Sequence, residues 1–275
     1  MNGALASRGR ALVVAWPGRQ ARWRAFELSG RALTEWRALP GECAGVELDT
    51  DHRLWIADPA FARVRCVNLF GNELCTLRAR ASAPRDGLGT LADPRGLCCA
   101  GDGDPLRLWL VQGGLRRGAV QLFDESGRAR LRLRSLGDAR EPFRNARRVR
   151  AAGRYVWVLE TLARRVQVFR DGDFHFAFQV RERGEPQPLS AIALYEDGSG
   201  VVCTDGAAPG LLRIGRSGNV REALSAPVEG ACDMALLDGV DPSSARVALL
   251  DREGLRVRAF DAAGVCQGEI EELAG

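Results

Sequence analysis

Short apolar runs separated by polar turns fill the whole chain. The runs are four to seven residues long, many alternate apolar with polar positions, and the intervening turns are rich in Gly, Asp and Ser. This pattern is typical of short antiparallel strands joined by tight hairpins. No segment carries a sustained 3.6-residue period, so we predict no helix in the core. The fold class predicted is all-β.

The runs recur in phase along the chain. Six similar runs, ALVVAW, RLWIAD, RLWLVQ, YVWVLE, GVVCTD and RVALLD, end at positions spaced by 42, 54, 48, 45 and 46 residues. A second marker is a turn glycine that closes an alternating run, and Gly127, Gly172, Gly218 and Gly264 step by 45, 46 and 46 residues. A repeat of this length with four short strands per unit predicts a β-propeller.

We therefore predict a single domain over residues 1–275, a six-bladed β-propeller of four-stranded antiparallel blades. The expected blades cover approximately residues 2–38, 43–80, 94–134, 144–181, 188–224 and 230–270. The innermost strands are expected near residues 3–6, 45–49, 96–100, 146–150, 190–194 and 233–237. The N-terminal segment is just long enough to supply its own inner strand.

In three of the repeats, the acid that ends the apolar run stands five residues before an arginine, at Asp58/Arg63, Glu160/Arg165 and Asp251/Arg256. Each acid ends the second strand of its unit and each arginine begins the third. A catalytic pair would occur once, whereas a recurring pair indicates scaffolding across equivalent loops. We expect partly exposed ion pairs worth about 1 kcal/mol or less.

The repeats resemble those of six-bladed NHL-repeat propellers. That family has a Pro-x-Gly opening, an apolar strand ending in Ala-Asp, and then Arg-x-x-x-Phe and a glycine. The segments that fit are DPRGLCC, LWIAD, RRVQVF and GRARLRL. The resemblance covers essentially the whole chain and implies a binding module, and some NHL propellers bind RNA through a basic face.

The mouth of the central channel is where a propeller usually binds its ligand. The repeat frame places Arg95, Asn145, Ser190 and Asp233 there. A metal-dependent lactonase of the gluconolactonase type, also six-bladed, needs a cage of carboxylates and asparagines for its cation. Asn145 and Asp233 match that cage, whereas Arg95 would repel a metal ion. The lactonase-like hydrolase is the alternative to a binding module, and we predict neither a metal nor a cofactor.

One segment is strongly basic. Residues 113–170 hold 15 arginines against five acids, a net charge of +10, whereas the formal charge of the chain is +4. The candidate binding residues in it are Arg128, Arg130, Arg132, Arg134, Arg144, Arg147 and Arg148. This segment suits an acidic protein partner or RNA. Alternatively, arginines on an outer strand simply prevent edge-to-edge pairing with other chains.

Composition narrows the other function classes. The chain contains no lysine, so its positive charge comes from arginine. This compositional bias weakens any inference of nucleic-acid binding from the number of basic residues. The eight cysteines include no C-x-x-C pair, and His52 and His175 are the two histidines. We expect buried, reduced thiols rather than a zinc site. No apolar run approaches the roughly 20 residues of a membrane span.

The sequence thus predicts a cytoplasmic, non-catalytic NHL-type propeller. We expect a monomer that binds a protein partner, acidic in character, through its channel mouth and basic face. The two alternatives are the lactonase-like hydrolase and RNA binding through the arginine-rich face.

Overall fold

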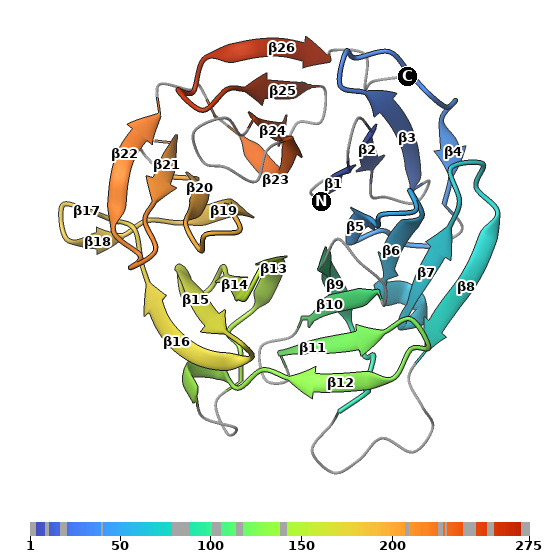
Figure 1. Ribbon diagram of the computed structural model, residues 1–275, viewed down its shortest axis with the longest axis horizontal. Coiled ribbons are helices and arrows are strands. Elements are labelled where there is room, and N and C mark those ends of the chain that lie inside the picture. Colours follow the sequence, from blue (N-terminus) through green and yellow to red (C-terminus); the bar gives the residue numbers. More distant parts are fainter. Residues whose placement is uncertain are drawn as a thin grey trace.

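The computed structural model describes residues 4–8, 11–16, 21–39, 41–78, 88–100, 106–113, 118–137, 142–206, 209–224, 228, 230–238, 246–251 and 256–270. Six four-stranded antiparallel sheets surround a central axis like the blades of a propeller (Figure 1). Each blade is built from four strands that are consecutive in sequence. The predicted six-bladed all-β fold is confirmed.

The first three blades run in order around the ring. Blade 1 contains β1 (Ala4–Arg8), β2 (Ala11–Trp16), β3 (Arg22–Glu27) and β4 (Arg37–Ala38). Blade 2 contains β5 (Gly45–Leu48), β6 (Leu54–Asp58), β7 (Arg63–Val67) and β8 (Glu73–Arg78). Blade 3 contains β9 (Pro94–Ala100), β10 (Arg107–Gln112), β11 (Ala119–Asp124) and β12 (Ala129–Arg132).

The other three blades complete the ring. Blade 4 contains β13 (Ala146–Ala152), β14 (Tyr155–Glu160), β15 (Arg165–Arg170) and β16 (Asp173–Phe178). Blade 5 contains β19 (Leu189–Leu194), β20 (Gly200–Thr204), β21 (Gly210–Ile214) and β22 (Val220–Leu224). Blade 6 contains β23 (Ala231–Asp238), β24 (Arg246–Asp251), β25 (Val257–Phe260) and β26 (Cys266–Ile270). The observed innermost strands overlap all six predicted ranges.

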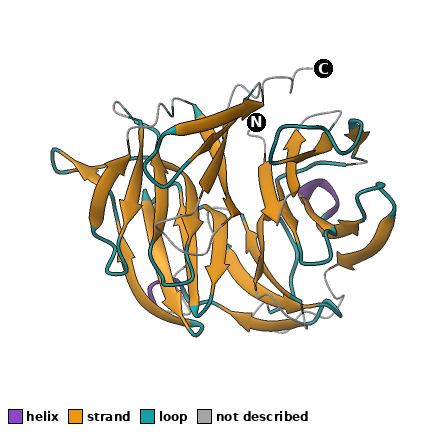
Figure 2. Cartoon of the chain, turned by 45° about the horizontal axis from the view of Figure 1, so that its top comes forward, coloured by secondary structure: helices purple, strands orange, loops and turns teal. Residues whose placement is uncertain are grey.

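Little lies outside the blades. A two-stranded hairpin of β17 (Arg181–Glu182) and β18 (Glu185–Pro186) projects between blades 4 and 5 (Figure 1). The described residues contain two short 3₁₀ segments, η1 (Pro59–Phe61) and η2 (Ser135–Gly137), shown in purple in Figure 2. No described helix is long and apolar enough to cross a membrane.

Apolar side chains fill the spaces between neighbouring blades. The tryptophans that recur in the second strands, Trp55, Trp109 and Trp157, are all buried. Trp55 packs with Leu97 and Leu108 of the next blade, and Trp157 packs with Ile192 in the same way. These aromatic residues are therefore part of the inter-blade core.

Among the described strands, none is exchanged between the first and last blades where the ring closes. β1 is the innermost strand of blade 1 and contacts β23 of blade 6. Asp233 Oδ2 accepts a hydrogen bond from Leu5 N at 3.1 Å, and Ser7 Oγ donates to Leu236 O. Leu5, Val14 and Phe26 share an apolar cluster with Leu237 and Leu250 across the same junction. Inter-blade packing and these two bonds hold the junction.

Candidate functional site

The acid–arginine pairs of blades 2 and 4 are scaffold contacts. Arg63 Nε donates to Asp58 Oδ2 at 2.9 Å, and Arg165 Nε donates to Glu160 Oε2. Both carboxylates are fully buried, which differs from the partly exposed pairs expected from sequence. They are buried because each carboxylate also binds the loop that leads into the inner strand of its own blade. Asp58 accepts a hydrogen bond from the backbone N–H of Glu42, and Glu160 accepts one from the backbone N–H of Arg144.

The same position in blade 3 confirms this role. Gln112 replaces the acid there, and its Oε1 accepts Ala92 N at 2.9 Å, in the segment that leads into β9. In blade 6 the expected pair of Asp251 and Arg256 is joined through the backbone, because Asp251 N donates a hydrogen bond to Arg256 O at 3.1 Å. The side chain of Arg256 lies near another acid, with Nη1 3.5 Å from Glu269 Oε1. The position at the end of the second strand thus anchors the loop in front of the first strand.

Asp233 is held in a buried ion pair that spans the channel. Arg148 of blade 4 donates from Nε to Asp233 Oδ1 of blade 6 at 2.9 Å, and both side chains are almost completely buried. Arg150 Nη2 adds a second contact at 3.3 Å and donates to Met234 O at 2.7 Å. Together with Leu5 N and Met234 N, four donors occupy this carboxylate. The proposed cation ligand is therefore engaged in ring closure.

A second channel carboxylate was not found by sequence reasoning. Glu47 lies on the inner strand β5, within the electrostatic reach of Arg150, Asp233 and Arg8. Burial raises the pKa of the Glu47 carboxyl to about 7, against the opposing influence of the Arg150 guanidinium. In the sequence, the repeats were compared by the residues at the start of each inner strand. Glu47 was missed because it is the third residue of its inner strand.

Two of the other predicted channel-mouth residues, Arg95 and Asn145, are engaged within their own blades, whereas the third, Ser190, is not. Arg95 is half exposed and its Nε pairs with Asp93 Oδ1 at 2.8 Å. Asn145 has a left-handed backbone, with φ of 57°, and its Nδ2 donates to Thr161 Oγ1 at 2.7 Å. Ser190 is buried on β19, and its Oγ has no hydrogen-bond partner among the described residues.

The arginines in and next to β12 are exposed, and β12 is the outermost strand of blade 3 (Figure 1). The exposed residues are Arg128, Arg130, Arg132 and Arg134, whereas the alternating Leu133 is buried. Arg130 pairs with Asp124 at 2.7 Å. We call these four residues the β12 arginine row. Its spacing matches the two-residue period predicted from sequence.

The second arginine group does not continue this row as one exposed patch. Arg144 is exposed in the loop before β13, Arg147 is half-buried, and Arg148 is buried in the channel pair with Asp233. The reason is topological, because β12 is the outermost strand of blade 3 and β13 is the innermost strand of blade 4. Consecutive sequence therefore passes from the rim of the propeller to its axis.

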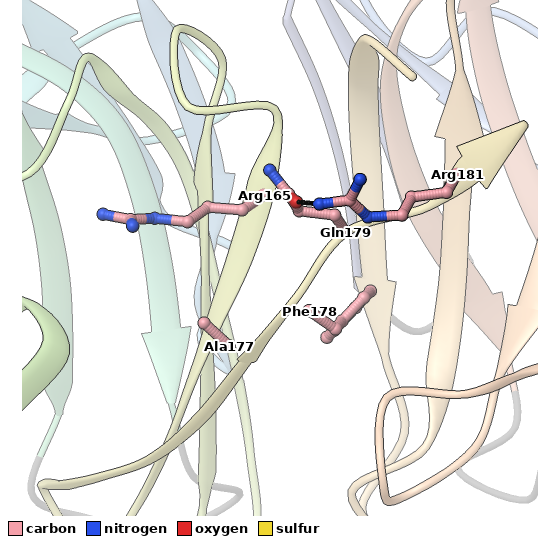
Figure 3. A pocket seen from close by; sticks show the side chains of 5 residues that line it. All are labelled: Arg165, Ala177, Phe178, Gln179 and Arg181. Atoms are coloured by element: carbon pink, nitrogen blue, oxygen red, sulfur yellow. Dashed lines mark hydrogen bonds between the residues drawn. The ribbon is translucent and has the colours of Figure 1, made fainter. Parts of the chain in front are cut away.

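A shallow cleft lies between β16 and the β17–β18 hairpin. Its volume is about 310 Å³, and it is lined by Arg165, Ala177, Phe178, Gln179 and Arg181. Figure 3 shows that Arg181 points to Gln179, to which it donates a hydrogen bond of 2.7 Å, while Arg165 points away from both. The polar groups of the cleft therefore do not converge on a common ligand position.

The histidines and cysteines lie apart from the channel carboxylates or deep in the core. His52 is exposed in the turn between β5 and β6, and His175 is exposed on the outermost strand β16. Six of the eight cysteines are buried, whereas Cys75 and Cys266 are exposed, and all are reduced. Within the described ranges, no three His, Cys, Asp or Glu side chains gather as metal ligands would.

Comparison with known proteins establishes the fold. No family model matches the sequence, and no curated protein matches it. Among solved structures, virginiamycin B lyase from Staphylococcus aureus is similar with a TM-score of 0.64 and 11% identity over 98% of this chain and 83% of that chain. The β-propeller domain of Cps50 (Swd1) from Myceliophteria thermophila gives a TM-score of 0.63 and 15% identity over 94% and 82% of the two chains.

A protein of unknown function from Bacteroides caccae is similar to the same degree. It has a TM-score of 0.65 and 10% identity over 96% of this chain and 94% of that chain. At these identities the likeness concerns the fold alone, and it extends over nearly the whole chain. The protein is a six-bladed β-propeller.

Proposed function

We propose that this protein is a non-catalytic binding propeller of the NHL-repeat type, and that the β12 arginine row docks an acidic segment of a protein partner. The observation that carries the proposal is the row itself, four exposed arginines at alternate positions, of which Arg130 and Arg132 lie on the outermost strand β12 and the other two flank it. Arginine forms bidentate hydrogen bonds with carboxylates, so a row of arginines suits an acidic chain.

The channel supports a structural role over a catalytic one. A metal-dependent lactonase would need Asp233 free to bind a cation, but Arg148 and Arg150 neutralise this carboxylate. One solved relative is a catalytically inactive histidine-to-alanine variant of virginiamycin B lyase with quinupristin. In this chain His175 lies on the outermost strand β16 and His52 in an exposed turn, which favours binding over a lyase reaction that depends on a histidine.

Retention on a polyanionic column tests the proposal. The variant Arg130→Ser/Arg132→Ser/Arg134→Ser removes three charges from the row, and the control Arg78→Ser/Arg183→Ser/Arg221→Ser removes three charges from exposed arginines elsewhere. We expect the row variant to elute from heparin at clearly lower salt than the control, because local charge density governs binding to a polyanion. Equal elution of the two variants would contradict the docking proposal. The role left for the row would then be to prevent edge-to-edge pairing of β12 with other chains.

A further inference from the structure

Two cysteines face one another on the outer hairpin of blade 2. In the antiparallel ladder of β7 and β8, Cys66 is directly opposite Cys75. Opposed residues in such a ladder project to the same face of the sheet, with Cβ atoms roughly 4.5–5.5 Å apart. The two thiols are close enough for each to influence the pKa of the other. In the ladders of the described strands, no other cysteine is paired with a cysteine.

The two thiols differ in access and in acidity. Cys66 is 1% exposed, whereas Cys75 is exposed on the outermost strand. Burial raises the pKa of the Cys66 thiol to about 12. Partial burial also raises the pKa of Cys75, but the neighbouring Cys66 thiol and the Arg53 guanidinium oppose that change. Cys75 is therefore the thiol that ionises first and meets reagents from solution.

We propose that Cys66 and Cys75 are a site of reversible oxidation, which forms an intramolecular disulfide with a two-electron oxidant such as hydrogen peroxide. The Cys75 thiolate attacks one peroxide oxygen, the O–O bond breaks, and the departing hydroxide takes a proton to become water. Cys66 then attacks the sulfur of the resulting sulfenic acid and expels its hydroxyl, which leaves as a second water with the Cys66 proton. Two thiols lose two electrons in total, and one peroxide is reduced.

The position of the pair favours a labile disulfide. A disulfide needs Cβ atoms about 3.5–4.5 Å apart, so the strands must draw together slightly from their usual separation. A bond formed under such strain is more easily reduced than a relaxed one. β8 is an outermost strand whose residues Glu73, Leu74 and Cys75 are exposed, and this allows both the adjustment and the approach of a reductant.

Cys266 provides an internal control. It is exposed on the outermost strand β26 of blade 6, the position in the fold that matches that of Cys75. Its cross-strand partner is Phe260 rather than a cysteine. Oxidation of Cys266 is therefore expected to give a sulfenic acid or a mixed disulfide with an added thiol, but not an intramolecular bond.

Mass spectrometry of the oxidised full-length chain tests the proposal. Trypsin cleaves after Arg65 and Arg78, so one peptide, CVNLFGNELCTLR, carries both cysteines. After peroxide treatment and alkylation we expect this peptide to be lighter by two hydrogens, without alkyl groups, and restored by dithiothreitol. The rate should rise about tenfold per pH unit near neutral pH, because the thiolate fraction of Cys75 limits it.

Two variants separate the steps. In Cys66→Ala, the sulfenic acid of Cys75 should persist and be trapped by dimedone, and in Cys75→Ser the light peptide should not form. The proposal would be overturned if Cys75 were oxidised to a sulfinic or sulfonic acid while Cys66 kept a free thiol that could be alkylated after unfolding. Disulfides that join Cys266 as readily as Cys75 would also overturn it. The wild-type peptide distinguishes these outcomes even if a variant fails to fold.

Discussion

Arg148 and Asp233, which are 85 residues apart in the sequence, form a buried ion pair with an Nε–Oδ1 distance of 2.9 Å. The pair links the inner strands of blades 4 and 6, and Asp233 also accepts Leu5 N of blade 1. One carboxylate therefore connects three blades around the axis. This contact stabilises a ring that has no shared strand at its junction.

Arg148→Met should destabilise the protein by about 2–4 kcal/mol, because it removes the main partner of a buried carboxylate. Arg150 remains 3.3 Å from Asp233, which keeps the expected loss below that of a completely unpaired charge. Urea unfolding measures the free energy. The double variant Arg148→Met/Asp233→Asn should lose less than the sum of the single variants, and strict additivity would contradict the proposed coupling.

Glu160→Ala should cost about 2–4 kcal/mol, because it leaves Arg144 N and Gln167 Nε2 without their buried acceptor. This is more than the value expected for an exposed pair. Arg154→Ala is the matched control, since Arg154 and Asp171 form an exposed pair in the same blade, and its loss should be much smaller than that of Glu160→Ala. Equal losses in thermal or urea unfolding would show that Glu160 does not anchor the loop.

Glu47→Gln should change how stability depends on pH. Because the pKa of Glu47 is raised from 4.5 to about 7, the folded chain binds this proton more tightly than the unfolded chain does. The wild-type protein therefore loses stability as pH rises from about 4.5 to 7, and the neutral variant does not share that loss. We expect the variant to be more stable by about 2 kcal/mol at pH 8 and nearly equal at pH 4. Parallel pH profiles would contradict a buried, proton-binding Glu47.

Periodicity predicted the fold because a propeller repeats its pattern in every blade. The strand-ending residues Asp58, Gln112 and Glu160 kept their phase since each performs the same loop contact. Only the degree of burial was missed, because a sequence pattern does not show which backbone donors converge on a side chain.

The channel could not be predicted in the same way. Whether Arg148 faces solvent or Asp233 depends on how blades 4 and 6 are oriented across the axis, which no local pattern records. The place of Asn145 at the channel mouth stays a prediction, and its left-handed backbone and its bond to Thr161 tie its side chain to blade 4. The alternation did predict that Arg128, Arg130, Arg132 and Arg134 are exposed, but the register shift at Arg130 interrupts the two-residue period, so their common face stays a prediction.

The most direct test of the proposed function is the affinity of the protein for an acidic peptide, measured by fluorescence anisotropy with labelled polyglutamate. Single-stranded RNA of equal charge serves as the competing ligand. We predict that Arg130→Ser/Arg132→Ser/Arg134→Ser weakens peptide binding by about tenfold or more at low salt, while Arg78→Ser/Arg183→Ser/Arg221→Ser changes it by less than about threefold. Tighter binding of RNA than of the peptide, or equal loss in both variants, would contradict a docking surface for an acidic protein.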